Sequence, residues 1–276
     1  MFINNIDPIL LNLGPFQIRY YGLFIVIGVI LIYFIMLYLA KKRIPDVDKE
    51  DLTDLIIYSI IGALIISRIF YCLVYNFPYY FSNPIKVFYI WEGGLSFHGG
   101  LLGGIIVGYI MSKIKKINPL DIADMSVIPS ALALVFGRLA NFLNAELIGT
   151  VTNLPWGVNF NNETNSIGEL VYRHPSQLYE SLKNLFIFIV LWNVKDKKVP
   201  KGTIFGLFVI MYSTLRFFIE FVRSPDPQIG YLWLGLTLGQ IINVVMFICG
   251  LIFLFYIYKK EKHAENRPKS QITQSS

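Results

Sequence analysis

The stretch GRLANFLNAELIG, from Gly137 to Gly149, ends an apolar segment and sets the class of fold. It places Arg138, Asn141 and Glu146 where a membrane-spanning helix ordinarily holds apolar side chains. An arginine at the centre of such a helix costs about 2.5–3.5 kcal/mol on insertion scales. A chain tolerates that cost where the group faces a partner, a cavity or a ligand, so the stretch predicts a membrane protein with a polar site.

The composition of the chain is that of a membrane protein. Hydrophobic residues make up 55% and charged residues 15% of the 276 positions, whereas a soluble domain holds about 25% charged residues. The net charge of +6 comes in short basic clusters between apolar runs, which argues against a nucleic-acid partner. The two cysteines lie inside apolar runs and the three histidines lack ligand spacing, so we expect no disulfide, no metal and no other cofactor.

Seven runs are long and apolar enough to cross a bilayer, whose core of about 30 Å takes roughly 20 helical residues. Their continuous apolarity indicates helices rather than the alternating strands of a barrel. We therefore predict an all-α, polytopic fold with one transmembrane domain over 1–258, a small ordered cap over 144–177, and a basic, disordered tail over 259–276. The expected spans cover 20–40, 55–75, 95–112, 122–143, 178–194, 203–222 and 236–258.

Basic residues are distributed unequally between the two sides of these spans. Sixteen lysines and arginines follow the first, third, fifth and last spans, whereas the opposite segments hold only four. By the positive-inside rule, the C-terminus is cytoplasmic and the N-terminus is outside. The cap and the end of the opening stretch then lie on the outer side.

Further polar motifs lie in the outer half of the membrane under this topology, or at its outer surface. Tyr212, Arg216 and Glu220 follow one another at i, i+4 spacing, on one face of a helix. Because the motifs share one side of the membrane, their side chains can converge with Arg138. The others are RYYG, with Tyr21, at the start of the first span; SFHGGLLGG, with His98, Gly99 and Gly100, at the mouth of the third; and HPSQLYE at the start of the fifth.

Several of these features also have a structural interpretation. The glycine spacing of the third span is typical of closely packed membrane helices, which we favour over a ligand role. Tyr20 fits an aromatic belt, and Arg68 fits a structural or snorkelling residue. For His98, a hydrogen-bonded structural role and a functional role both stay open.

Two arginines facing outward in a lipid-lined cavity suit a phosphodiester head group, whose acyl tails can stay in the bilayer. Guanidinium groups bind phosphate oxygens bidentately, and a low dielectric strengthens the pairing. Arg216 and Glu220 could instead neutralise each other, which leaves Arg138 to pair with another group such as Glu146. The residues alone indicate an outer-leaflet phospholipid site and do not separate binding from reaction.

In these motifs the chain resembles the prolipoprotein diacylglyceryl transferase family, from RYYG near residue 19 to the last span. The match includes GRLANFLNAELIG, HGG at 98–100, HPSQLYE and Tyr212-x-x-x-Arg216. The resemblance implies transfer of an sn-1,2-diacylglyceryl group from phosphatidylglycerol to the lipobox cysteine thiol of a prolipoprotein signal peptide, at the bacterial inner (cytoplasmic) membrane. The products would be a thioether and glycerol 1-phosphate, with membrane lipid and prolipoprotein as partners and no cofactor.

The same resemblance implies roles for individual residues. The thiol base stays open, because an arginine-lined site could favour the thiolate without a dedicated base such as His98. The implied catalytic residues are His98, Arg138, Tyr212 and Arg216, and the implied phosphatidylglycerol-binding residues are Tyr21, Gly99, Gly100, Arg138, Asn141, Glu146, Gly149, Arg216 and Glu220.

Two other classes of function remain as alternatives. An outward-facing anion or phospholipid transporter would use the same arginines, but it needs a polar path through the cytoplasmic half, where the sequence holds almost no polar residues. A non-catalytic lipoprotein-binding or assembly factor would not need a histidine, a tyrosine and two arginines together.

Overall fold

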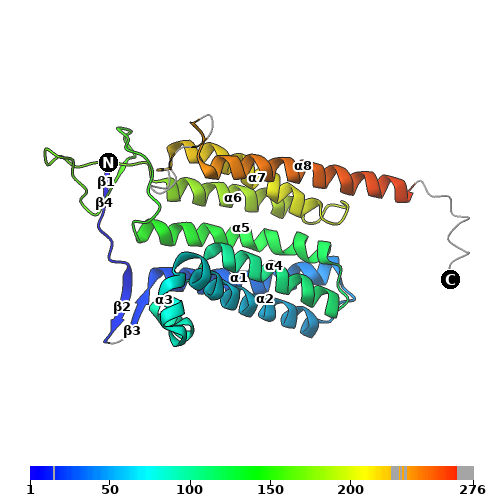
Figure 1. Cartoon of the computed structure of the whole chain (residues 1–276). Helices are drawn as coiled ribbons and strands as arrows, with labels where there is room; N and C mark the ends of the chain where they lie inside the picture. Colours follow the sequence, from blue (N-terminus) through cyan, green and yellow to red (C-terminus); the bar gives the residue numbers. More distant parts are fainter. Residues whose placement is uncertain (15, 225–229, 231, 233–234, 266–276) are drawn as a thin grey trace, which may run out of the picture. The chain divides into compact units, whose positions relative to one another are not determined.

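The computed structural model is mostly helical and describes residues 1–14, 16–224, 230, 232 and 235–265 (Figure 1). A helix forms at each of the seven positions that the sequence predicts. The helices are α1 (Tyr20–Arg43), α2 (Lys49–Phe70), α4 (Phe97–Ile114), α5 (Pro119–Leu143), α6 (Ser176–Val194), α7 (Thr203–Ile219) and α8 (Leu238–Glu265).

Six of these helices, within the described residues, are long and apolar enough to cross a membrane. The exception is α6, because its first half holds Gln177, Glu180, Lys183 and Asn184, all buried. The polytopic all-α class is thus confirmed. The predicted tail begins inside α8, which runs to Glu265, and residues 266–276 lie outside the described residues.

The chain divides into two compact units. The first unit holds Met1–Ile35 and the chain from Asp124 onward, and the second holds Met36–Ala123. Each is described by itself. The prediction of a single transmembrane domain over 1–258 stays a prediction.

In the first unit, α7 packs against both α6 and α8, and the three helices lie side by side in Figure 1. Glycine allows the approach between α7 and α8: a Cβ at Gly206 would lie 2.3 Å from Leu254 Cδ2. The N-terminus of α7 is capped by a buried carboxylate of α5, because Asp124 accepts hydrogen bonds from the amides of Gly202 (2.9 Å) and Phe205 (2.8 Å). A carboxylate suits the partial positive charge of a helix N-terminus.

Among the described residues, four short strands that the sequence analysis did not predict lie in the N-terminal segment and within residues 144–177, where a cap is predicted. Strand β1 (Phe2–Asn4) pairs in parallel with β4 (Val158–Phe160), and the Asn4 side-chain amide donates to the carbonyl of Phe142 at 2.7 Å. Strands β2 (Ile9–Leu13) and β3 (Phe16–Arg19) form an antiparallel hairpin before α1. The N-terminal segment is therefore attached both to the cap and to the end of α5.

In the second unit, α2 packs along α4 through small residues. A Cβ at Gly103 would lie 2.5 Å from the carbonyl oxygen of Gly62, and one at Gly99 would lie 2.8 Å from that of Ile66. Side chains at these positions would separate the two backbones, so the packing interpretation of these glycines is confirmed.

Arg68 organises the connection between α2 and α4. It is 4% exposed and donates to the carbonyls of Lys86 (2.7 Å), Val87 (2.8 Å), Tyr89 (3.1 Å), Gly93 (2.5 Å) and Gly94 (3.0 Å). Its structural interpretation is confirmed. The connection consists of a π-helical turn (Tyr71–Tyr75), α3 (Phe77–Ser82) and two 3-10 turns (Pro84–Phe88 and Ile90–Glu92).

Candidate functional site

A buried carboxylate, Glu180 of α6, lies at the centre of a polar cluster in the first unit. Its side chain is 2% exposed. Lys183 Nζ lies 2.7 Å from Glu180 Oε2, Arg216 Nη1 of α7 lies 2.8 Å from Oε1, and Arg138 Nε of α5 lies 3.7 Å from Oε2. A buried ion is tolerated only when partners offset its desolvation, and these three cations supply that compensation.

The two arginines that the sequence singles out therefore come together at Glu180. Arg138 pairs with this residue and not with Glu146, which corrects the partner suggested from the sequence. The interaction follows from helix geometry, because Arg138 and Glu180 lie on neighbouring helices, whereas Glu146 lies in the turn after α5.

Glu220 attaches the cluster to the start of α8. The predicted ion pair with Arg216 is present at 2.6 Å, and Glu220 Oε1 also accepts from Thr237 Oγ1 at 3.2 Å. Thr237 and Gln240 form a capping box, since Thr237 Oγ1 accepts from the Gln240 amide and Gln240 Oε1 accepts from the Thr237 amide. A Cβ at Gly239 would lie 2.7 Å from Glu220 Oε1, so the glycine makes room for this carboxylate.

Tyr212 and Tyr21 border the cluster. Lys183 Nζ lies 3.7 Å from the centroid of the Tyr212 ring, a cation–π contact. Tyr212 also interacts electrostatically with Arg138, as does Tyr21 at the start of α1.

The turn after α5 holds Glu146 beside Asn141. Asn141 Nδ2 donates to Glu146 Oε2 at 3.1 Å, and the flanking residues Ala145 and Leu147 adopt positive φ angles of 52° and 56°. Side chains at the start of α6 fix this backbone, because Gln177 Nε2 donates to the Glu146 carbonyl at 2.5 Å and Ser176 Oγ to that of Leu147 at 2.8 Å. Non-glycine residues in this region cost of order 1–3 kcal/mol each and persist only where surrounding contacts hold them.

Gly149 connects the cap to the backbone just before α6 and just after α7. Its amide donates to the carbonyl of His174 at 3.0 Å, and the next amide, of Thr150, donates to that of Val222 at 3.0 Å. A Cβ at Gly149 would lie 2.5 Å from His174 O and 2.6 Å from Val222 O. The structure thus gives this glycine a packing role next to the site.

His98, Gly99 and Gly100 belong to the second unit, at the first turn of α4. Ser96 caps this helix by accepting from the Gly99 amide at 3.3 Å, and the Ser67 hydroxyl donates to the Ser96 carbonyl at 2.7 Å. His98 is exposed. The functional roles of these three residues stay predictions.

Sequence reasoning missed two members of the cluster, Glu180 and Lys183. Both are ionisable residues within a predicted span, which is a signal for a functional or paired group. It also missed a chain of aromatic contacts beside the cap, in which Trp156 Nε1 donates to Tyr179 OH at 2.8 Å and Tyr179 OH lies 3.1 Å from His174 Nδ1. Because the single phenolic hydrogen is free to donate, the geometry favours His174 Nδ1 as acceptor.

The cluster has an excess of positive charge. Arg138, Lys183 and Arg216 face the two carboxylates, Glu180 and Glu220, which leaves one positive charge uncompensated. Arg223 adds to this potential, and burial together with nearby Arg216 lowers the pKa of its guanidinium. The arginines are also the accessible cations, at 18% exposed for Arg138 and 12% for Arg216 against 2% for Lys183.

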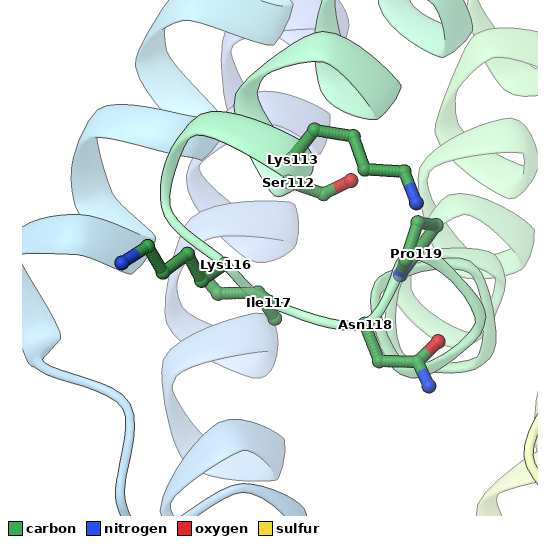
Figure 2. A pocket seen from close by; sticks show the side chains of 6 residues that line it. All are labelled: Ser112, Lys113, Lys116, Ile117, Asn118 and Pro119. Atoms are coloured by element: carbon green, nitrogen blue, oxygen red, sulfur yellow. The ribbon is translucent and has the colours of Figure 1, made fainter.

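A separate pocket of about 380 Å³ lies in the second unit, where the chain passes from α4 to α5 (Figure 2). In Figure 2 the Lys113 side chain extends toward Pro119, whereas Lys116 points away from it. The Ser112 hydroxyl donates to the Tyr109 carbonyl at 2.7 Å. The pocket contains none of the predicted site residues, and we assign it no ligand.

Comparison with known proteins supports the family resemblance that the motifs indicate. The family model described as prolipoprotein diacylglyceryl transferase matches residues 8–256. Curated relatives named phosphatidylglycerol–prolipoprotein diacylglyceryl transferase include one from Geobacter sulfurreducens, 40% identical over 93% of this chain and 97% of its own length. Relatives from Nitratidesulfovibrio vulgaris (39%, covering 90% and 94%) and Coxiella burnetii (38%, covering 95% and 99%) carry the same name. The chain therefore belongs to the prolipoprotein diacylglyceryl transferase family.

Proposed function

We propose that this chain transfers the diacylglyceryl group of phosphatidylglycerol to the lipobox cysteine thiol of a prolipoprotein signal peptide. The observation that carries the proposal is the buried cluster around Glu180, which presents Arg138 and Arg216 with an excess of positive charge. An excess of positive charge suits the negative charge of a phosphodiester head group. The names of the relatives supply the reaction.

The chemistry explains why two arginines suit this reaction. The thiolate sulfur attacks the sn-3 carbon of the diacylglyceryl group, a carbon–sulfur bond forms, and the bond from that carbon to the phosphate oxygen breaks. The thiol proton is released, and the phosphodiester monoanion leaves as glycerol 1-phosphate with a second negative charge. Donors that bind this developing charge more strongly than the ground state accelerate the step.

Within this proposal, Arg138 and Arg216 bind the phosphate and stabilise its second charge. Tyr212 and Tyr21 border the head group, and Asn141 with Glu146 forms the wall beside Arg138. We assign His98 to the catalytic site by family resemblance and leave the thiol base open, because the arginines can themselves favour the thiolate.

We also propose that the cluster faces the outer side of the bacterial inner membrane, with the N-terminus outside and the C-terminus cytoplasmic. The supporting observation is the unequal distribution of basic residues between the two sides. A thiol on a secreted preprotein would reach the cluster from that side. The transporter alternative is not favoured, because the relatives are named as transferases.

A direct assay tests the function. Purified protein is incubated with phosphatidylglycerol and a lipobox peptide, and the expected result is a peptide mass gain of one diacylglyceryl unit. A peptide with serine in place of the cysteine should show no gain. No gain with the cysteine peptide, under conditions where another family member reacts, would contradict the enzymatic proposal.

Substitutions then test the arginines. Arg138→Ala and Arg216→Ala should each lower turnover by at least about 10²-fold, since removing one donor to a developing oxyanion costs about 10²–10³ in kcat. Arg19→Ala, which removes an exposed arginine of β3, should have little effect. Full activity in both cluster variants would show that the phosphate assignment is wrong.

A further inference from the structure

Lys183 is a buried cation to which the proposed reaction gives no role. Its side chain is 2% exposed, and it lies one turn along α6 from Glu180. The ammonium group sits between Glu180 Oε2, at 2.7 Å, and the ring centroid of Tyr212, at 3.7 Å. A lysine in the interior of a membrane protein is costly, so a group held this closely has a defined electrostatic task.

Lys183 and Arg138 share one oxygen atom as their partner. The lysine makes the short contact with Glu180 Oε2, at 2.7 Å, whereas Arg138 Nε stays at 3.7 Å from the same atom. Charge-assisted hydrogen bonds between nitrogen and oxygen are about 2.7–2.9 Å long. The lysine therefore holds the hydrogen-bonding position, and Arg138 is attracted to Glu180 without being bound tightly by it.

The choice of residue type fits this division. An ammonium is a compact point charge and neutralises one carboxylate oxygen without needing a planar partner. A guanidinium is a planar fork that matches the oxygens of a phosphate. The cluster thus uses its lysine for the short contact with the carboxylate, and Arg138, at 18% the more exposed cation, lies farther from that oxygen.

We infer that Lys183 is a positioning residue for the phospholipid site: it occupies Glu180 Oε2 and so keeps the Arg138 guanidinium available for the phosphate head group. The inference rests on the proposed function, because it assigns the head group to Arg138. Without Lys183, Arg138 would close onto the vacated oxygen of Glu180. The head group would then have to displace an internal ion pair.

A substitution with a readout of binding tests this role. Lys183→Met keeps the length of the side chain and removes its charge. Initial rates of thioether formation are measured against the mole fraction of phosphatidylglycerol in mixed detergent micelles. We expect KM for phosphatidylglycerol to rise about tenfold, or about 1.4 kcal/mol, while kcat changes less than threefold, because Arg138 still reaches the phosphate once it is bound. Lys195→Met, the same change just beyond the end of α6, should leave both constants unchanged.

The Lys183→Met substitution made in a Glu180→Gln protein separates a positioning role of Lys183 from a merely structural one. In Glu180→Gln protein the carboxylate that Lys183 occupies is absent, so adding Lys183→Met should not change KM further. This comparison also applies if Lys183→Met alone does not fold, because the double variant removes both members of the buried Lys183–Glu180 pair. An unchanged KM in Lys183→Met, or an equal rise in the Glu180→Gln background, would overturn the inference. Wild-type protein that forms no thioether would instead contradict the proposed function itself.

Discussion

The two arginines of the cluster are not equivalent at the level of single residues. Arg216 is held by two carboxylates, at 2.8 Å from Glu180 and 2.6 Å from Glu220, and is therefore fixed before any ligand arrives. Arg138 has a looser contact, at 3.7 Å, and is the more exposed of the two. Removing one partner of a buried pair costs about 3–5 kcal/mol, so variants of Glu180 should lose stability as well as change the site.

The two glycines that bound the opening stretch offer a contrast at the same scale. Gly149→Ala should destabilise the protein by about 1–3 kcal/mol, the usual cost of overpacking, because its Cβ would lie 2.5 Å from His174 O and 2.6 Å from Val222 O. Both are backbone atoms and cannot turn aside. Thermal unfolding of the purified protein in detergent measures the effect.

Gly137→Ala is the matched control. A Cβ at Gly137 would meet nothing within 4 Å, and the residue lies inside α5. Alanine there should be neutral or stabilise the helix by about 0.5–1 kcal/mol. Equal unfolding temperatures for Gly149→Ala and Gly137→Ala would show that the close contacts at Gly149 do not determine the stability of the protein.

The sequence identifies the site residues whose chemistry is unusual for their position. Arg138 and Arg216 can be found because each is an ion in an apolar run. The importance of Glu180 and Lys183 depends on which face of α6 turns inward, and hydropathy does not specify that rotation. The partner of Arg138, for which the sequence suggests Glu146 as one possibility, could not be specified for the same reason, because contacts between helices are set by packing.

At the scale of elements, hydropathy predicts long helices well and short strands poorly. All seven predicted helices form, and six of them, within the described residues, are extended apolar runs. Strand β1 has three residues, and its partner β4 lies more than 150 positions away, so neither has a local pattern. The capping box at Thr237 and Gln240 is a local signal, and it could have been recognised from T-x-x-Q before an apolar run.

The cap contains an ion pair whose contribution depends on pH. Glu163 Oε1 and Oε2 accept from Arg173 Nη2 (2.5 Å) and Nε (2.6 Å), and this pairing lowers the pKa of Glu163. A carboxyl with a lowered folded-state pKa contributes stability that is present above its unfolded pKa, about 4.3, and is lost as pH falls through the folded value. Glu163→Gln should therefore destabilise the cap at pH 7 by up to about 1 kcal/mol, because the pair is partly exposed.

Hydrogen exchange of the cap amides between pH 7 and pH 3, compared at equal intrinsic exchange rates, measures this difference. The gap between wild type and Glu163→Gln should be largest at neutral pH and should shrink toward the acid end. Glu169→Gln, which changes another carboxylate of the same cap, is the control; its partner is the side-chain amide of Asn165. A gap that grows as pH falls would contradict the assignment.

At the scale of the whole molecule, the number of membrane crossings decides whether the two termini lie on the same side of the membrane. The six most apolar helices alone would be an even number and would place both termini on one side. Including α6 gives seven, a number that would place the termini on opposite sides, as the distribution of basic residues predicts. With 19 residues, α6 is about 28 Å long at 1.5 Å per residue, close to the roughly 30 Å of a bilayer core. Its buried polar groups face other helices instead of lipid, which allows such a helix to cross.

Cysteine labelling in intact cells tests this crossing directly. Ile167→Cys, in the cap, and Lys198→Cys, after α6, are each introduced into a chain whose native cysteines are replaced by alanine; both positions are exposed. A membrane-impermeant maleimide should label position 167 in intact cells and position 198 only after permeabilisation. If both react in intact cells, α6 does not cross the membrane, and the number of spans is even. If only position 198 reacts, the orientation is reversed, and the arginine cluster would face the cytoplasm, where a secreted lipobox cysteine does not arrive.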